Sequence, residues 1–252
     1  MPYALIQQEP VPPPLEKLQR AFRAVRCLTP ADAHSVGRDG FGILVKHFSA
    51  EDAERLHHAL HIEGIETEIV EQQLLPELPP VKFMNRMDCL PESLMLYDPL
   101  GRSFPLEWKN IMAIAAGSVR LSEFQRVQES RAKFQFNSQG VPALVTTTDS
   151  SHREQLNYHL MLEIILTRAV LRYSVTADRF NFAYLGERRT KSLPANFTLL
   201  VRDLVQFAPQ ARLNHGARLL RDNTAEVWSY PSKNAFQEEM IWMLWQMKKS
   251  AS

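Results

Sequence analysis

Cysteine, glycine and long hydrophobic runs are all scarce in this chain of 252 residues. Its two cysteines, Cys27 and Cys89, lie far apart, which argues against a disulfide framework and a cysteine-based metal cluster. The longest apolar stretch, residues 160–166, contains Glu163 and is far shorter than the roughly 20 residues that span a bilayer. The first residues also lack the basic flank and apolar segment of a secretory signal. We therefore expect a cytoplasmic protein without a membrane span.

Motifs that mark known catalytic or cofactor sites are missing as well. The sequence has no glycine-rich phosphate loop, no dinucleotide fingerprint, no zinc-protease helix motif and no nucleophile elbow. The pattern Ser-x-x-Lys at residues 130–133 lies in a polar stretch without its usual partner motifs. We expect no cofactor and no enzymatic activity, and an enzyme of unrecognised type is the least favoured alternative.

Charge is balanced overall but unevenly distributed. The formal net charge is +1, yet residues 1–80 hold 7 basic and 12 acidic residues, whereas the remainder holds 22 and 16. This asymmetry fits an anionic partner for the second part, or two parts of the chain that attract each other, and the second explanation is favoured. One short alternation of basic and aromatic residues, 133–136, is too little to predict nucleic-acid binding.

A proline-rich segment divides the chain. Residues 76–82 include three prolines and predict an extended linker between a domain at residues 1–75 and a larger one at 83–252. In the first part, the pattern predicts strands at 3–7, 31–36, 41–48 and 65–70, with a turn at 37–40. It predicts one helix from Leu15 and a second helix that Ser49 opens. This βαββαβ order resembles the ferredoxin-like fold of small regulatory modules.

The second part favours strands, with two or three helices. Strands are predicted at 94–97, 103–108, 118–124, 156–167, 170–176 and 180–185, with helical turns at 109–116 and a helix that Asn196 opens. Residues 126–153 show no periodicity and predict a long irregular loop. A final helix opens at Ser232 or Asn234. The order of elements resembles the pleckstrin-homology type of half-barrel closed by a C-terminal helix, and a generic α+β domain is the alternative.

Two small groups of polar residues are candidate ligand sites. Arg188, Arg189 and Lys191 follow a glycine on a predicted loop and could hold a phosphorylated small molecule or another anion, although solvated loop charges are favoured. His57 and His61 lie one helical turn apart, a spacing that can hold a metal ion. With no third ligand in the pattern, surface histidines are the favoured interpretation.

The last predicted helix has an unusually broad apolar surface that includes Phe236, Met240, Trp242, Met243 and Trp245. A helix that packs across a sheet is the favoured explanation, and docking of a partner is the alternative, because Met and Trp suit adaptable binding surfaces. From these patterns we expect a regulatory or scaffolding module that binds a protein partner or a second copy of itself. The alternative is a sensor of a small phosphorylated ligand at Arg188, Arg189 and Lys191.

Overall fold

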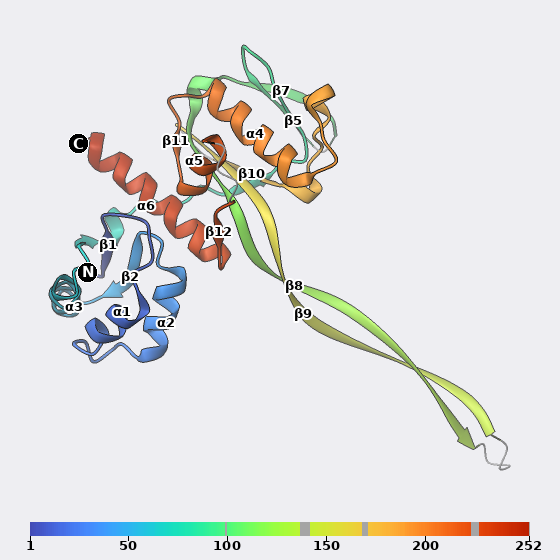
Figure 1. Cartoon of the computed structure of the whole chain (residues 1–252), viewed down its shortest axis with the longest axis horizontal. Coiled ribbons are helices and arrows are strands. Elements are labelled where there is room, and N and C mark those ends of the chain that lie inside the picture. Colours follow the sequence, from blue (N-terminus) through green and yellow to red (C-terminus); the bar gives the residue numbers. More distant parts are fainter. Residues whose placement is uncertain (99, 137–141, 168–170, 223–226, 252) are drawn as a thin grey trace. The chain divides into compact units, whose positions relative to one another are not determined.

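The structure is a computed structural model of the chain. It describes the backbone of every residue except 99, 137–141, 168–170, 223–226 and 252, and it describes side chains outside these residues and outside 123–155 and 251. The chain divides into two compact units. The larger one is made of Met1–Val119 with His159–Ser252, and the smaller one of Arg120–Tyr158. The fold is mixed α+β, with antiparallel and mixed sheets (Figure 1). None of the described sheets closes into a barrel.

The first sheet of the larger unit has three antiparallel strands in the order β2-β1-β3. These strands are β1 (Tyr3–Gln7), β2 (Ile43–Phe48) and β3 (Thr67–Glu71). One face packs on helices α1 (Leu15–Phe22), α2 (Pro30–Asp39) and α3 (Ala50–Ile62). Leu5, Leu18, Phe22 and Leu56 are fully or almost fully buried there. The predicted strand at 3–7 and the helix capped by Ser49 are confirmed.

The strand predicted at residues 31–36 is wrong, because these residues belong to α2. Thr29 caps this helix: its hydroxyl accepts a hydrogen bond from the N–H of Asp32, whose carboxylate accepts one from the N–H of Thr29. Pro30 opens the helix with φ already fixed. The turn predicted at 37–40 is the end of the same helix. The sheet has three strands among the described residues, so the ferredoxin-like arrangement with four strands is not confirmed.

Helix α6 (Lys233–Ala251) packs on the other face of this sheet. Ile6 and Val70 form a small core with Trp245, while their neighbours Leu5 and Ile69 point into the core under α1 and α3. Residues 4–7 of β1 are therefore all buried. The predicted last helix is confirmed, but it covers the first sheet as well as contacting the second part of the chain (Figure 1).

The second part of the chain builds a mixed sheet in the order β11-β8-β9-β10-β4, with β12 also on β8. A separate antiparallel sheet has the order β5-β6-β7. Helices α4 and α5 complete the core. The strands are β4 (Val81–Phe83), β5 (Met87–Cys89), β6 (Leu94–Tyr97), β7 (Ser103–Leu106), β8 (Ile111–Phe136), β9 (Pro142–Leu166), β10 (Arg172–Thr176), β11 (Arg212–Leu213) and β12 (Ser229–Tyr230), and the helices are α4 (Leu193–Phe207) and α5 (His215–Arg221).

The predicted linker is tied to this mixed sheet. Arg172 donates its backbone N–H to the carbonyl of Pro80 at 2.9 Å, and its guanidinium donates to the carbonyl of Pro79. The same guanidinium pairs with the buried carboxylate of Glu163. Residues 81 and 82 continue as β4, parallel to β10. The pleckstrin-homology arrangement is not confirmed by this strand order.

Three local predictions in this part are wrong. Residues 109–116 are not helical beyond a short 3-10 turn, Trp108–Asn110, because β8 begins at Ile111. Residues 180–185 are not a strand: residues 183–185 belong to the 3-10 turn Ala183–Arg188, and the 3-10 turn Ala177–Arg179 ends just before residue 180. Asn181 accepts a hydrogen bond from the N–H of Ala183, which supports a turn instead of an extended backbone. Helix α4 is capped by Ser192, not Asn196.

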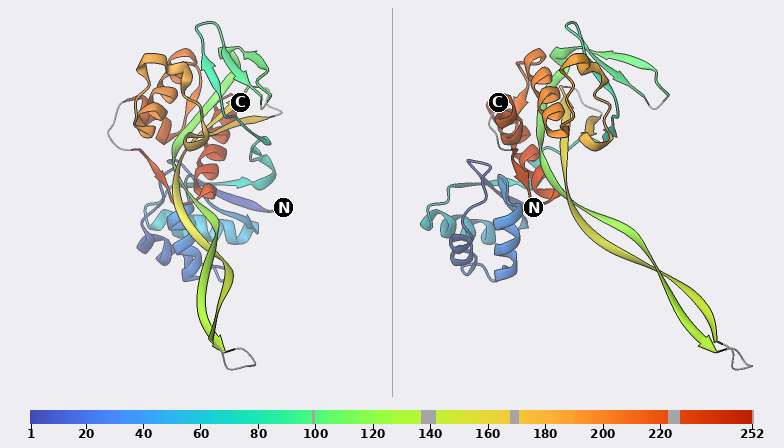
Figure 2. Two further views of the ribbon diagram at one scale, coloured as in Figure 1. Left: turned by 90° about the vertical axis from the view of Figure 1, so that its right-hand side faces the viewer. Right: turned by 45° about the vertical axis from the view of Figure 1, so that its right-hand side comes forward.

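The smaller unit, 120–158, is made of the remaining parts of β8 and β9 and the residues between them (Figure 2). The irregular loop predicted at 126–153 is therefore wrong at residues 126–136 and 142–153, which are strand. The sequence of these residues shows no regular periodicity, and the backbone hydrogen bonds of a strand form whatever the side chains are.

Candidate functional site

A groove of about 320 Å³ runs along the outer edge of β2 in the first sheet. Its floor is five consecutive residues of β2, Ile43 to His47. Helix α2 forms one wall through Ser35, Val36 and Asp39, and the start of α6 forms the other through Asn234 and Glu238. The groove lies between these two helices, which pack on opposite faces of the sheet.

No strand of the described chain pairs with the outer edge of β2. An edge strand directs half of its backbone N–H and C=O groups away from its neighbour, where another extended segment can pair with them. Lysine often protects such an edge from unwanted pairing. Here the ammonium of Lys46 is held by Glu238 at 2.8 Å, which keeps the lysine against α6.

The wall formed by α6 includes a carboxylate oxygen without a partner. Oε1 of Glu238 accepts a hydrogen bond from the ammonium of Lys46, whereas Oε2 is buried and has no hydrogen-bond partner among the described residues. A buried acceptor of this kind is costly unless a donor reaches it. Asp39 is satisfied, because Ser232 donates to its Oδ1 at 2.8 Å and Arg38 to its Oδ2 at 2.7 Å.

The groove ends at a backbone irregularity. His47 has φ of 64°, a left-handed conformation that is uncommon outside glycine. Its N–H donates to Oε1 of Gln72 at 2.8 Å, and pairing between β1 and β2 shifts register on the way to this residue. Irregularities of this kind redirect or terminate strand pairing, so the regular outer edge of β2 ends near His47.

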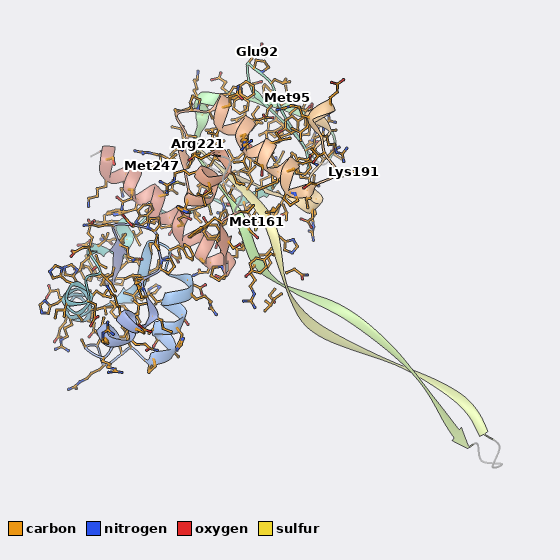
Figure 3. All side chains as sticks on the ribbon, in the orientation of Figure 1. Glu92, Met95, Met161, Lys191, Arg221 and Met247 are labelled. Carbon is orange, nitrogen blue, oxygen red and sulfur yellow. The ribbon has the colours of Figure 1, made fainter. Side chains whose placement is uncertain are left out.

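The predicted anion-binding residues are not brought together as a free cationic site. Arg188 makes two hydrogen bonds of 2.8 Å to the carboxylate of Asp203, which is 9% exposed. Tyr184 donates to the same carboxylate at 3.1 Å. The charge of Arg188 is therefore balanced inside the fold. Arg189 and Lys191 are exposed and precede α4 in the chain. Lys191 is labelled in Figure 3.

Burial next to this carboxylate affects two further groups. It raises the pKa of the Cys89 thiol to about 12, with Asp203 adding to the effect. Burial likewise raises the pKa of the Tyr184 hydroxyl. A thiol with so high a pKa stays protonated and is a poor nucleophile. The cluster of Cys89, Tyr184, Arg188 and Asp203 thus acts structurally, by fixing the 3-10 turn before α4 to β5 and α4.

The predicted partner-binding residues of α6 are largely occupied within the chain. Phe236, Met240, Met243 and Trp245 are buried, and Trp242 is half-buried, with its indole N–H donating to the carbonyl of Gln7 at 2.8 Å. Contacts with both parts of the chain account for the breadth of this apolar surface. Docking of a partner on these residues stays a prediction.

The two histidines considered for metal binding contact other side chains. Nδ1 of His57 lies 2.8 Å from the hydroxyl of Thr67, and Nδ1 of His61 lies 2.9 Å from the carboxylate of Glu66. Within the described residues there is no group of three His, Cys, Asp or Glu side chains that could hold a metal ion.

A buried polar network that the sequence did not predict joins β8, α5 and α6. Asn214 accepts from the N–H groups of Ala116 and Ala217, both at 2.9 Å, and donates to the hydroxyl of Tyr230 at 2.7 Å. Tyr230 in turn donates to Glu239, whose other oxygen accepts from the N–H of His215 at 2.7 Å. Burial raises the pKa of Glu239. The one signal in the sequence was a glutamate next to Met240 on an otherwise apolar surface.

No protein-family model matches the chain, and no curated protein and no solved structure matches it either. Among the helices that the structure describes, none is both long enough and apolar enough to cross a lipid bilayer.

Proposed function

We propose that this chain is a protein-binding module that pairs an extended segment of a partner protein with the outer edge of β2. The outer edge of β2, which no strand of the described chain pairs and which lies inside a walled groove, is the observation that supports this proposal. Recognition by strand addition takes its affinity from backbone hydrogen bonds and its specificity from side-chain contacts with the walls. A non-enzymatic role and a cytoplasmic location remain part of the proposal. So do the resemblance of the first part of the chain to the ferredoxin-like fold and that of the second part to the pleckstrin-homology fold.

The walls favour a partner segment over a small molecule. A strand laid along β2 would lie between α2 and α6, so its alternate side chains would meet one helix or the other. Ile43, Leu44 and Val45 give the floor an apolar character, which suits aliphatic side chains. The unpartnered Oε2 of Glu238 can accept a hydrogen bond from a donor on the partner. Linear peptides with an aliphatic residue and a nearby cation or amide are therefore the expected ligands.

Selection from a library of random linear peptides tests the proposal directly. We expect selected peptides to compete with one another and to slow hydrogen exchange of backbone amides in β2. Ser35→Trp fills the groove from the exposed rim of α2 and should weaken binding at least about tenfold by excluding the peptide. Ala31→Trp, on the same helix but outside the groove lining, is the matched control and should leave binding within about twofold.

Two outcomes contradict the proposal. One is a library from which no peptide is retained. The other is a set of peptides that bind Ser35→Trp and the parent protein equally, which would place the binding surface elsewhere.

A further inference from the structure

A second groove, of about 300 Å³, lies where α6 meets α5 and β11, and it shares no lining residue with the groove along β2. Its apolar surface comes from Leu213, Trp242, Met243 and Met247. Met247, labelled in Figure 3, lies near the C-terminal end of α6. Arg212 and Arg218 line the same groove, and no acidic residue does so among the described residues. The groove therefore combines an aromatic surface with two cations.

Both arginines are available to a ligand. They are exposed, and within the described residues neither guanidinium has a hydrogen bond or an ion pair. This distinguishes them from Arg188, which is bound to Asp203. A guanidinium presents a planar set of donors that matches phosphate and carboxylate oxygens. Two of them at one groove without a carboxylate among its lining residues predict affinity for an anion.

The indole of Trp242 is held in place before any ligand arrives. Its N–H donates to the carbonyl of Gln7, and its ring lies against Gly42 so closely that a Cβ there would be 2.3 Å from Cγ. Trp242 is also one of the residues that line the groove. A fixed aromatic surface binds a flat ring without losing side-chain freedom, which favours a ligand with an aromatic part.

We propose that the groove bounded by Arg212, Arg218 and Trp242 binds a small aromatic phosphate, with the phosphate on the arginines and the aromatic ring against Trp242 and Met247. Its volume is at the lower end of the about 300–1,000 Å³ of ligand pockets, which limits the ligand to about the size of a mononucleotide. Gln8, Gln246 and Ser250 provide polar groups at the same groove. The proposal does not depend on strand addition at β2.

Titration of the full-length chain with mononucleotides, monitored by calorimetry and by quenching of tryptophan fluorescence, tests the assignment. The matching nucleosides and inorganic phosphate are titrated in parallel. We expect mononucleotides to bind at least about tenfold more tightly than either fragment, because both parts of the groove are used. Binding should weaken as salt is raised, since the arginines are exposed.

Substitutions locate the site. Arg212→Gln should weaken mononucleotide binding at least about tenfold by removing charge-assisted hydrogen bonds. Arg189→Gln, which removes an exposed arginine from the loop before α4, is the matched control and should have no effect. The proposal would be overturned if both variants lost the same affinity for mononucleotides, or if only Arg189→Gln lost affinity. Nucleosides that bind as tightly as the matching nucleotides would also overturn it. So would the absence of binding to any mononucleotide.

Discussion

The indole of Trp242 in α6 lies directly against Gly42, the residue before β2, where φ is +88°. Gly42 thus meets two requirements at once, a left-handed backbone and room for a ring. Since Gly42 also accepts a hydrogen bond from the N–H of Gln7 at 2.8 Å, this contact connects α6 to the pairing of β1 and β2.

Replacing Gly42 with alanine should destabilise the protein. The left-handed backbone costs about 1 kcal/mol for alanine, and the clash with Trp242 adds about 1–3 kcal/mol. Gly101→Ala is the matched control, because Gly101 has a similar φ of +80° but nothing within 4 Å of the added Cβ. Urea unfolding measures the free energy of unfolding of both variants. Equal destabilisation of the two variants would show that the contact with Trp242 has no energetic importance.

Glu239 should make stability depend on pH. Its pKa is raised by burial, so the folded state holds a proton that the unfolded state releases near the ordinary pKa of glutamate. Stability therefore falls as pH rises from that ordinary value to the raised one. Glu239→Gln should flatten this fall, and its stability relative to the parent protein should increase across the same window.

Urea unfolding at a series of pH values measures this difference. Glu54→Gln, which changes an exposed glutamate of α3, is the control and should leave the pH dependence unchanged. A parent protein whose stability does not fall in this window, or a Glu239→Gln variant with the same slope, would contradict the prediction.

Arg188→Ala should destabilise the second part of the chain by about 1–3 kcal/mol, because the buried carboxylate of Asp203 loses two charge-assisted hydrogen bonds. The side chain of Arg188 is 53% exposed, which favours the lower end of this range. Arg189→Ala should change stability by less than about 0.5 kcal/mol, as is usual for exposed positions. Chemical denaturation measures the free energy of unfolding of both variants and so distinguishes the two expected effects. Similar small changes in both variants would mean that the pairing is energetically unimportant.

The sequence predicted elements whose local signals agree with their surroundings. The alternation and turn around β6 and β7 and the serine cap of α3 are of this kind. Helix α2 was missed although Thr29, Pro30 and Asp32 form a standard opening, because residues 31–36 show no apolar stripe and only Ala33 is buried. A helix with so small a buried face gives a weak periodic signal.

The candidate sites were harder to predict because they depend on which distant segments meet. Arg188 was predicted as a ligand-binding residue, but its partner Asp203 comes from α4, which the pattern could not place beside it. The groove along β2 needs α2 and α6 on opposite faces of one sheet. The full length of β8 and β9 was not predicted for a different reason. Residues 126–153 lack the alternation of apolar and polar residues that indicates a strand with one buried face.

The packing of α6 against β1 and β3 has a consequence for how the chain is made. The strands of the first sheet are translated before the second part of the chain, whereas the helix that shields Ile6 and Val70 is translated after it. At ordinary elongation rates the gap is roughly 10–40 seconds. During that interval Ile6 and Val70 lack the contact with Trp245 that buries them in the folded chain.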